Sequence, residues 1–264
     1  MKKQRLGLTL IELIVVVAIL AVLTMIIVPK LDGLRNNANH AAAAASVSDS
    51  TRYLQTWTAM KTTTFPDGWD SLTDGTNMWA PASNATKTKG LHSTFSATGK
   101  FMQGALTADD VAGLKAIGIE TVYDVTPALA ATKRPGDMFT TARLLDGTTP
   151  NGVFVNSNTS AGRNIIDRIY RANQKTGSTV GVSGTIPGGR RLLALGLGPM
   201  NEMIGKLTVD APAYANVDSS LVYNRNIGLF EVGAGASKAI FRGFVASDGD
   251  LQDDLSTYMN RDIQ

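Results

Sequence analysis

The first apolar stretch of the chain runs from Leu8 to Val28, and Glu12 is the only charged residue within it. A helix rises about 1.5 Å per residue, so these residues span roughly 30 Å, the thickness of the hydrocarbon core of a bilayer. The stretch therefore predicts a transmembrane helix. A charge at the centre of such a helix costs roughly 2.5–3.5 kcal/mol and less near an end, which makes Glu12 a candidate functional residue.

Beyond Pro29 the pattern predicts that the helix continues as an amphipathic segment over residues 30–63. Apolar positions spaced three and four residues apart form one predicted stripe, which later residues extend: Leu31, Leu34, Ala38, Ala41, Ala45, then Tyr53, Leu54, Trp57 and Met60. The stripe suits packing against a neighbouring helix or, above all in its C-terminal half, against the chain's own domain. Gly33 weakens the first turns, so a kink or partial melting is expected across residues 29–37.

From residue 64 onward, short apolar runs alternate with Gly, Ser, Thr, Asn and Pro, which predicts a globular domain over residues 64–264. Residues 67–104 are expected to be irregular. Thr107–Asp110 resembles a capping box with Asp in place of Glu, and predicts a helix that ends near Gly118. Strands are predicted at Thr121–Val125, Met138–Leu145, Val153–Val155, Arg191–Leu197, Leu207–Val209, Leu221–Val232 and Ala239–Val245, and further helices from Ser160 and over Leu251–Met259. This mixture predicts an α+β fold.

Composition and charge exclude several function classes. The chain has 25 basic and 22 acidic residues, but three of the basic ones lie before the apolar run, within residues 1–7. Without them the charges balance, and no basic stripe remains that could follow a phosphate backbone, so no nucleic-acid partner is expected. The absence of cysteine excludes thiol catalysis and Cys-ligated zinc. No serine-hydrolase, phosphate-loop or zinc-protease motif occurs, so the chain is not expected to be an enzyme.

The N-terminal segment resembles the class III signal of type IV pilins and of the pseudopilins of type II secretion systems. A short basic leader ends in Gly7, an apolar start follows at Leu8, Glu12 is the fifth residue after the leader, and Pro29 lies at the family's usual helix kink. Leu8 stands where the family most often has Phe. The resemblance implies cleavage after Gly7 by prepilin peptidase, methylation of the new amine, and a helix that carries an antiparallel sheet. It also implies that Glu12 pairs with the amine of an adjacent subunit in a filament.

These features together predict the organisation and the location of the chain. Residues 1–7 form the leader, 8–29 the transmembrane and assembly helix, 30–63 its amphipathic continuation, and 64–264 the exported domain. The basic leader stays in the cytoplasm, so the domain is expected in the periplasm or outside the cell, anchored in the inner membrane. A secretory signal peptide would have a shorter apolar core and a small-residue cleavage site. A plain membrane anchor would explain the length and the basic flank, but not Glu12.

The predicted function is structural: a pseudopilin of a type II secretion system. Its expected partners are prepilin peptidase, an inner-membrane assembly platform, and other copies or related subunits. A type IV pilin that serves adhesion, motility or DNA uptake is an alternative within the same class. An alternative from another class is a membrane-anchored enzyme or ligand-binding domain with a borrowed signal, because the domain is large for a pseudopilin.

An acidic loop near the C-terminus contains four carboxylates, Asp248, Asp250, Asp253 and Asp254. A hard cation that needs six to eight oxygen ligands suits such a cluster. The loop loosely resembles the calcium-binding C-terminal loop of major pseudopilins, which implies calcium as a candidate cofactor. The alternative is structural: Asp248 and Asp250 form a turn, and the other two occupy the first turn of a helix, where its dipole favours negative charge.

Overall fold

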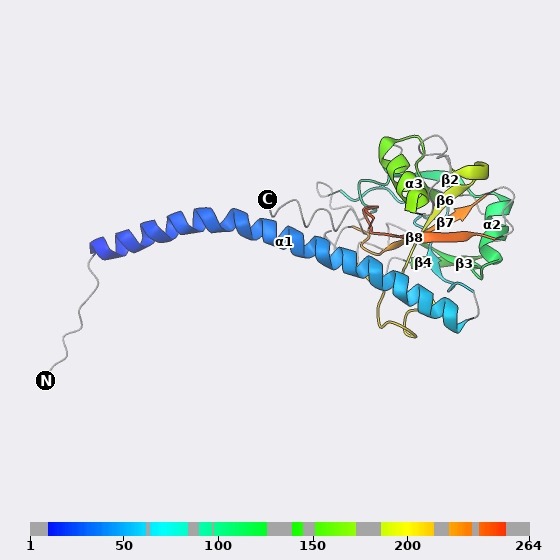
Figure 1. The fold of residues 1–264 in the computed structure, drawn as a ribbon, viewed down its shortest axis with the longest axis horizontal. Helices are drawn as coiled ribbons and strands as arrows, with labels where there is room; N and C mark the ends of the chain where they lie inside the picture. The colour runs from blue at the N-terminus through cyan, green and yellow to red at the C-terminus, as the bar shows by residue number, and fades with distance from the viewer. Residues whose placement is uncertain are drawn as a thin grey trace.

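A computed structural model describes residues 10–61, 64–83, 90–96, 98–125, 139–144, 151–172, 186–213, 222–233 and 238–251. One long helix, α1 (Leu10–Met60, 51 residues), carries a globular head that contains a sheet and shorter helices (Figure 1). The head lies against the C-terminal part of α1, and the N-terminal part extends away from it. The predicted α+β fold, with a long helix that carries a largely antiparallel sheet, is confirmed.

The helix α1 continues through residue 29 and beyond without a break, so the partial melting allowed for residues 29–37 does not occur. Figure 1 shows a gently curved helix. Its contact with the head begins near Ala43 and recurs every three or four residues, at Ala43, Val47, Ser50, Leu54 and Trp57. The Asn226 side-chain amide of the head adds a polar contact, because it donates to Ser46 Oγ at 2.8 Å and to Ser50 Oγ at 2.9 Å.

The N-terminal part of the predicted stripe does not pack against the chain's own domain. Its members there are all exposed: Leu31, Leu34, Ala38, Ala41 and Ala45. Among the described residues of α1, full burial begins at Ala43, and the head covers the face that presents Leu54 and Trp57, which are large and therefore gain most from burial. The helix thus keeps a separate apolar face along residues 31–45.

The described part of the head forms one sheet, with the strand order β2-β5-β6-β1-β3-β4 and with β7 and β8 attached through β6. The strands are β1 (Trp69–Asp70), β2 (Phe101–Ala105), β3 (Thr121–Val125), β4 (Phe139–Leu144), β5 (Asn151–Val155), β6 (Arg191–Gly196), β7 (Ile227–Val232) and β8 (Ile240–Val245). Neighbouring strands pair antiparallel, except that β1 and β3 pair parallel. Strand β6 is central because it pairs with β5, β7 and β1.

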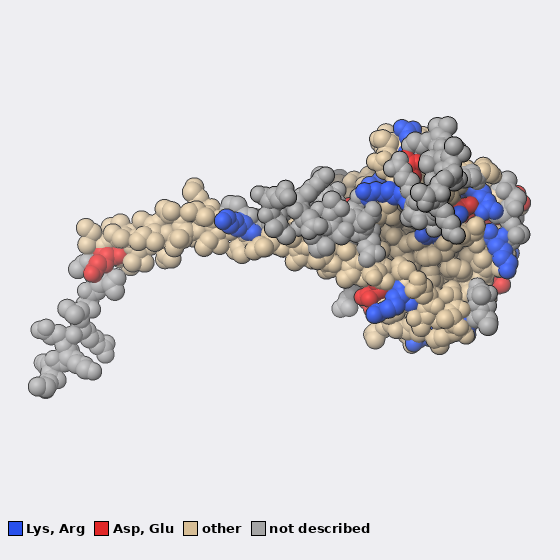
Figure 2. Space-filling model, in the orientation of Figure 1, with Lys and Arg blue, Asp and Glu red and all other residues tan. Residues whose placement is uncertain are grey.

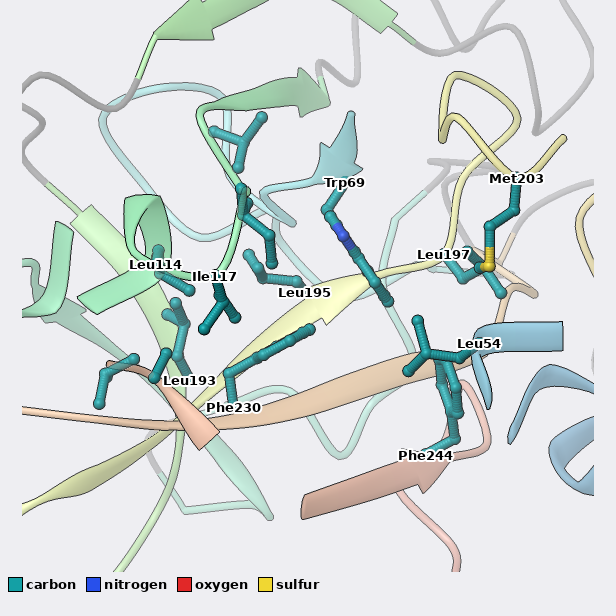
Figure 3. Packing of buried hydrophobic residues seen from close by; sticks show 14 of the residues in the cluster. Leu54, Trp69, Leu114, Ile117, Leu193, Leu195, Leu197, Met203, Phe230 and Phe244 are labelled. Carbon is teal, nitrogen blue, oxygen red and sulfur yellow. The ribbon is translucent and has the colours of Figure 1, made fainter. Parts of the chain in front are cut away.

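One face of the sheet packs against α1 and α2 (Ala108–Lys115) around a buried tryptophan (Figure 3). The Trp69 ring lies edge-on to Phe230, with 5.1 Å between ring centroids, and stacks on Phe244 at 6.1 Å. Leu54 and Trp57 of α1 belong to the same cluster, as does Leu114 of α2. The head is therefore attached to α1 through its own hydrophobic core.

The opposite face of the sheet packs against α3 (Ser160–Ala172). The three isoleucines of α3, Ile165, Ile166 and Ile169, are buried against alternate residues of the strands. In β6, for example, Leu192 faces α3 and Leu193 faces α2, because successive side chains of a strand point to opposite faces. The sheet is thus covered on both faces, and α1 lies on only one of them.

The predicted capping box at the start of α2 is confirmed. Thr107 Oγ1 accepts a hydrogen bond from the Asp110 amide at 3.2 Å, and Asp110 Oδ2 accepts one from the Thr107 amide at 2.7 Å. Two amides without a helical partner are satisfied in this way. Gly118, just beyond the helix, has a φ of +96°, a conformation that favours glycine.

Several predicted elements differ from the structure. Leu207–Val209 is not a strand: the Gly205 and Leu207 amides bond within a turn, to Thr208 and Met203, and Val209 is 96% exposed. The predicted strand over residues 221–232 is shorter, because β7 begins only at Ile227. The region predicted to be irregular, residues 67–104, contains β1 and most of β2. The short helix predicted from Leu251 lies, beyond its first residue, outside the described residues.

Candidate functional site

The N-terminal part of α1 is apolar and unburied. Residues Leu10–Val28 have a mean hydropathy of 3.1, and none of this segment is buried within the chain. Exposure of the larger apolar side chains ranges from 47% at Leu23 to 80% at Met25. Because burying apolar surface gains about 25 cal/mol per Å², a helix of this kind is stable only in lipid or against other apolar surfaces.

Two polar side chains in this segment, Thr24 and Glu12, are compatible with apolar surroundings because of their positions in the helix. The Thr24 hydroxyl donates to the Leu20 carbonyl at 2.8 Å, so it has a partner within the helix itself. Glu12 is exposed and lies in the first turn of α1, where the helix dipole favours a negative charge. Figure 2 shows this part of α1 almost free of charge, with acidic atoms near its free end.

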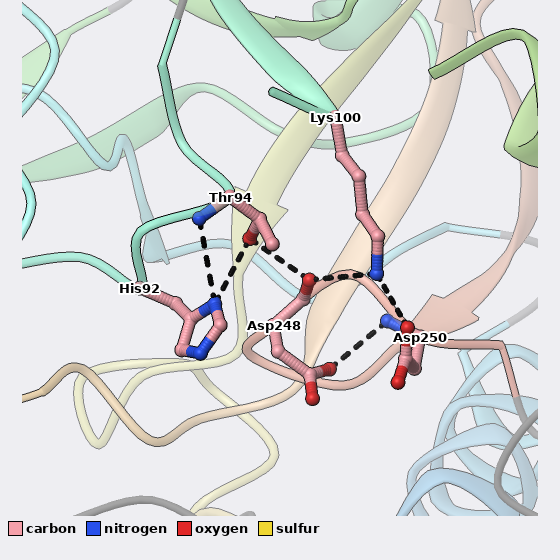
Figure 4. Close-up of polar contacts among 5 residues, drawn as sticks. All are labelled: His92, Thr94, Lys100, Asp248 and Asp250. Carbon is pink, nitrogen blue, oxygen red and sulfur yellow. Dashed lines mark hydrogen bonds and ion pairs between the residues drawn. The ribbon is translucent and has the colours of Figure 1, made fainter. Parts of the chain in front are cut away.

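The acidic loop lies on the head, directly after β8, and Figure 4 shows its polar contacts. The Asp250 amide donates to Asp248 Oδ1 at 3.0 Å, which is the predicted turn. The Lys100 ammonium, from the residue just before β2, donates to the Asp248 carbonyl at 3.1 Å and forms an ion pair with the Asp250 carboxylate. The Thr94 hydroxyl also donates to the Asp248 carbonyl, at 2.9 Å.

His92 lies beside this loop and is bound to the same threonine. The Thr94 amide donates to His92 Nδ1 at 3.4 Å, and the Thr94 hydroxyl lies 3.2 Å from the same nitrogen. Burial lowers the pKa of His92 below its ordinary value, against the charge of Asp248, and the Lys100 ammonium lowers it further. The lowered pKa favours the neutral imidazole, whose hydrogen-bond partner is Thr94, and Thr94 in turn binds the loop through the Asp248 carbonyl.

The family model of the prokaryotic N-terminal methylation motif matches residues 2–28. The chain carries the class III signal of type IV pilins and pseudopilins. No curated protein and no solved structure matches the chain. The similarity is therefore confined to the N-terminal segment, and the head lies outside the matched residues.

The structure places the predicted signal residues as far as it describes them. Glu12 lies in α1, and the helix backbone runs on through Pro29. Gly7 and Leu8 lie outside the described residues, so the cleavage site stays a prediction from the signal. The apolar helix with a pilin-type signal fits a membrane-anchored, pilin-like protein.

The calcium prediction can be compared with the described half of the acidic loop. The structure brings Asp248 and Asp250 together, whereas Asp253 and Asp254 lie outside the described residues. The carboxylate of Asp250 and the carbonyl of Asp248 already share one cation, the Lys100 ammonium. A calcium ion that used these two oxygens would have to displace Lys100. Calcium binding therefore stays a prediction, and the Lys100 ammonium would compete with calcium for these two oxygens.

Asp70 of β1 is a buried carboxylic acid that the sequence analysis did not single out. It is fully buried, and the Tyr223 hydroxyl donates to its Oδ2 at 2.5 Å. Burial raises the pKa of Asp70 to about 8, although the Tyr223 hydrogen bond and the charge of Arg225 act in the opposite direction. Tyr223 is 153 residues away in the sequence, so no local spacing could have indicated the pair.

Proposed function

We propose that the chain is a subunit of a helical, pilus-like filament, and that its system is a type II secretion system, which makes it a pseudopilin. Prepilin peptidase removes residues 1–7, and the subunits pack through α1 on an inner-membrane assembly platform. The observation that carries the proposal is the class III signal on a helix whose apolar residues 10–28 have no partner in the described chain. A head-to-tail contact between such helices does not close on itself and so produces a fibre.

The architecture of the head supports this proposal. The described core residues of α1 begin at Ala43, and the large apolar side chains described before that point are exposed, so they can pack on other subunits. Residues 31–45 add a second exposed face with several alanines, whose small side chains allow close approach of neighbouring helices. The same helix can therefore lie in the membrane as a monomer and pack against other subunits in a filament once it has left the membrane.

Glu12 is the residue that tests assembly most directly. In the proposed filament its carboxylate pairs with the amine of Leu8 in an adjacent subunit, within a low-dielectric interior where an unpaired charge is costly. We expect Glu12→Ala to leave leader cleavage and membrane insertion intact and to reduce the yield of sheared filaments. Thr24→Val is the matched control, because the Thr24 hydroxyl is satisfied by its own helix. Equal filament yields from both variants would contradict the role of Glu12.

A deletion strain separates the pseudopilin from the type IV pilin alternative. We expect the strain to retain a secreted protein in the periplasm while twitching, adhesion and DNA uptake continue. Loss of surface fibres, motility or uptake with normal secretion would instead assign the chain to a type IV pilus. A third outcome would favour a membrane-anchored binding or enzymatic domain. In that case the deletion changes neither secretion nor the pilus functions, and in wild-type cells the protein occurs only in membranes and not in fibres.

A further inference from the structure

The head contains a cavity of about 500 Å³ that residues of β2, β5, β6 and α3 line. Its floor is apolar and consists of Val155, Ile166, Ile186 and Leu192, each at most 8% exposed. This size and this lining are typical of sites for small ligands, which are mostly apolar with a few polar groups at defined positions. Three of these four residues belong to β5, α3 and β6, so the floor is built by the packed core of the head.

The charges around the cavity are positive. Of the described residues that line it, three are arginines and none is acidic. Arg191 is paired with Asp110 at 2.5 Å. Arg190 donates to Glu231 at 2.8 Å, but Glu231 also accepts hydrogen bonds from Tyr170 and Arg242, so two arginines share one carboxylate.

Arg163 differs from the other two arginines. Within the described residues its guanidinium makes one hydrogen bond, a long one of 3.5 Å to the Asn158 carbonyl, and pairs with no carboxylate. It rises from α3 one turn before Ile166 of the cavity floor, so a charged group and an apolar surface lie side by side. A guanidinium binds a carboxylate through two parallel hydrogen bonds, which makes it the natural partner of such a group.

We propose that this cavity binds a small organic carboxylate with an apolar body. The carboxylate pairs with the Arg163 guanidinium, and the body lies on Val155, Ile166 and Leu192. None of the described residues that line the cavity belongs to α1, and the three apolar residues that hold the body pack against α3 rather than α1, so the site can be tested apart from assembly.

Three compounds with one apolar body and different head groups test this site: 3-phenylpropionate, 3-phenylpropanamide and 3-phenylpropylamine. Binding to the full chain in detergent is measured by calorimetry, with detergent alone as the blank. We expect the carboxylate to bind more tightly than the amide, and the amine to bind weakest. Arg163→Gln should weaken binding of 3-phenylpropionate about tenfold, the loss of one charge-assisted contact, and Arg163→Lys should weaken it less.

Arg168→Gln is the matched control, since Arg168 is exposed on the same helix and does not line the cavity. It should leave the affinity for 3-phenylpropionate unchanged. Melting curves of all variants verify that the head is folded. Equal affinities for the carboxylate and the amide, an unchanged affinity in Arg163→Gln, or no binding of any of the three compounds would each overturn the proposal.

Discussion

The buried carboxyl of Asp70 predicts an unusual dependence of stability on pH. Its pKa in the folded chain is about 8, raised chiefly by burial, against an ordinary value of 3.8. Between these two pH values the carboxyl is protonated in the native state and ionised in the unfolded state. The unfolded state therefore binds fewer protons, and the free energy of unfolding falls as pH rises through this window. Below pH 3.8 the stabilisation is fully present, and above about pH 8 it is lost.

The magnitude follows from the size of the pKa shift. Each pH unit inside the window corresponds to about 1.4 kcal/mol, so Asp70 should lower the free energy of unfolding by roughly 3 kcal/mol between pH 5 and pH 7. Asp70→Asn has nearly the same shape and cannot ionise. It also retains an oxygen that can accept the Tyr223 hydrogen bond. The difference in stability between the Asn variant and the wild type should therefore grow by that amount over the two pH units.

The assay is denaturant unfolding of the full chain in detergent, at pH 5 and at pH 7, for the wild type and Asp70→Asn. Comparing the two proteins at each pH removes the contributions of all other titrating groups. Asp109→Asn provides the control, because Asp109 is an exposed carboxylate in the first turn of α2. A stability difference between Asp70→Asn and the wild type that stays constant with pH would refute the raised pKa.

Three further predictions concern the head. If calcium binds the acidic loop, adding calcium should raise the melting temperature, and Lys100→Ala should make this rise larger because the competing ammonium is gone. Asp250→Ala should abolish the rise. No rise even in Lys100→Ala would contradict the calcium hypothesis. Thr107→Ala removes the cap of α2 and should lower the free energy of unfolding by about 1 kcal/mol, as measured by denaturant unfolding. Leu114→Ala leaves a cavity in the core and should cost about 2–5 kcal/mol in the same assay, whereas a loss below 1 kcal/mol would contradict its central position.

The elements that the sequence predicted well are those with a local physical signal. The capping box at Thr107 depends on residues three positions apart, and α2 begins there as expected. The isoleucines of α3 repeat at helical spacing and are buried together. Strand β3 was predicted with its observed bounds, Thr121–Val125, because β-branched and aromatic residues gather there. Local periodicity carries this information without any knowledge of the partners.

The features that the sequence did not reveal depend on distant partners. Periodicity indicates an apolar stripe on α1, but the head decides which face of the helix is buried: it covers Ala43 and Val47 and leaves Ala41 and Ala45 exposed. Lys100 is 150 residues from Asp250, and the cavity residues come from four separate segments. Strand β1 has only two residues, too few for any periodicity to show, although Trp69 within it is central to the core. The need for glycine at position 198 also depends on a distant residue, because a Cβ there would lie 2.0 Å from Asp70 Oδ1.

The two faces of the sheet divide the tasks proposed for this chain. The face that packs on α1 and α2 has to hold the head firmly on the helix through which the proposed filament assembles. Trp69, Phe230 and Phe244 suit this requirement, since their rings interlock at the contact with α1. The described core cluster on the α3 face contains no residue of α1, and this face supplies the apolar floor of the cavity beside Arg163. Changes at that cavity can therefore alter what the head binds while the helix that drives assembly keeps its position, so Arg163→Gln and Glu12→Ala should have separable effects in the same strain.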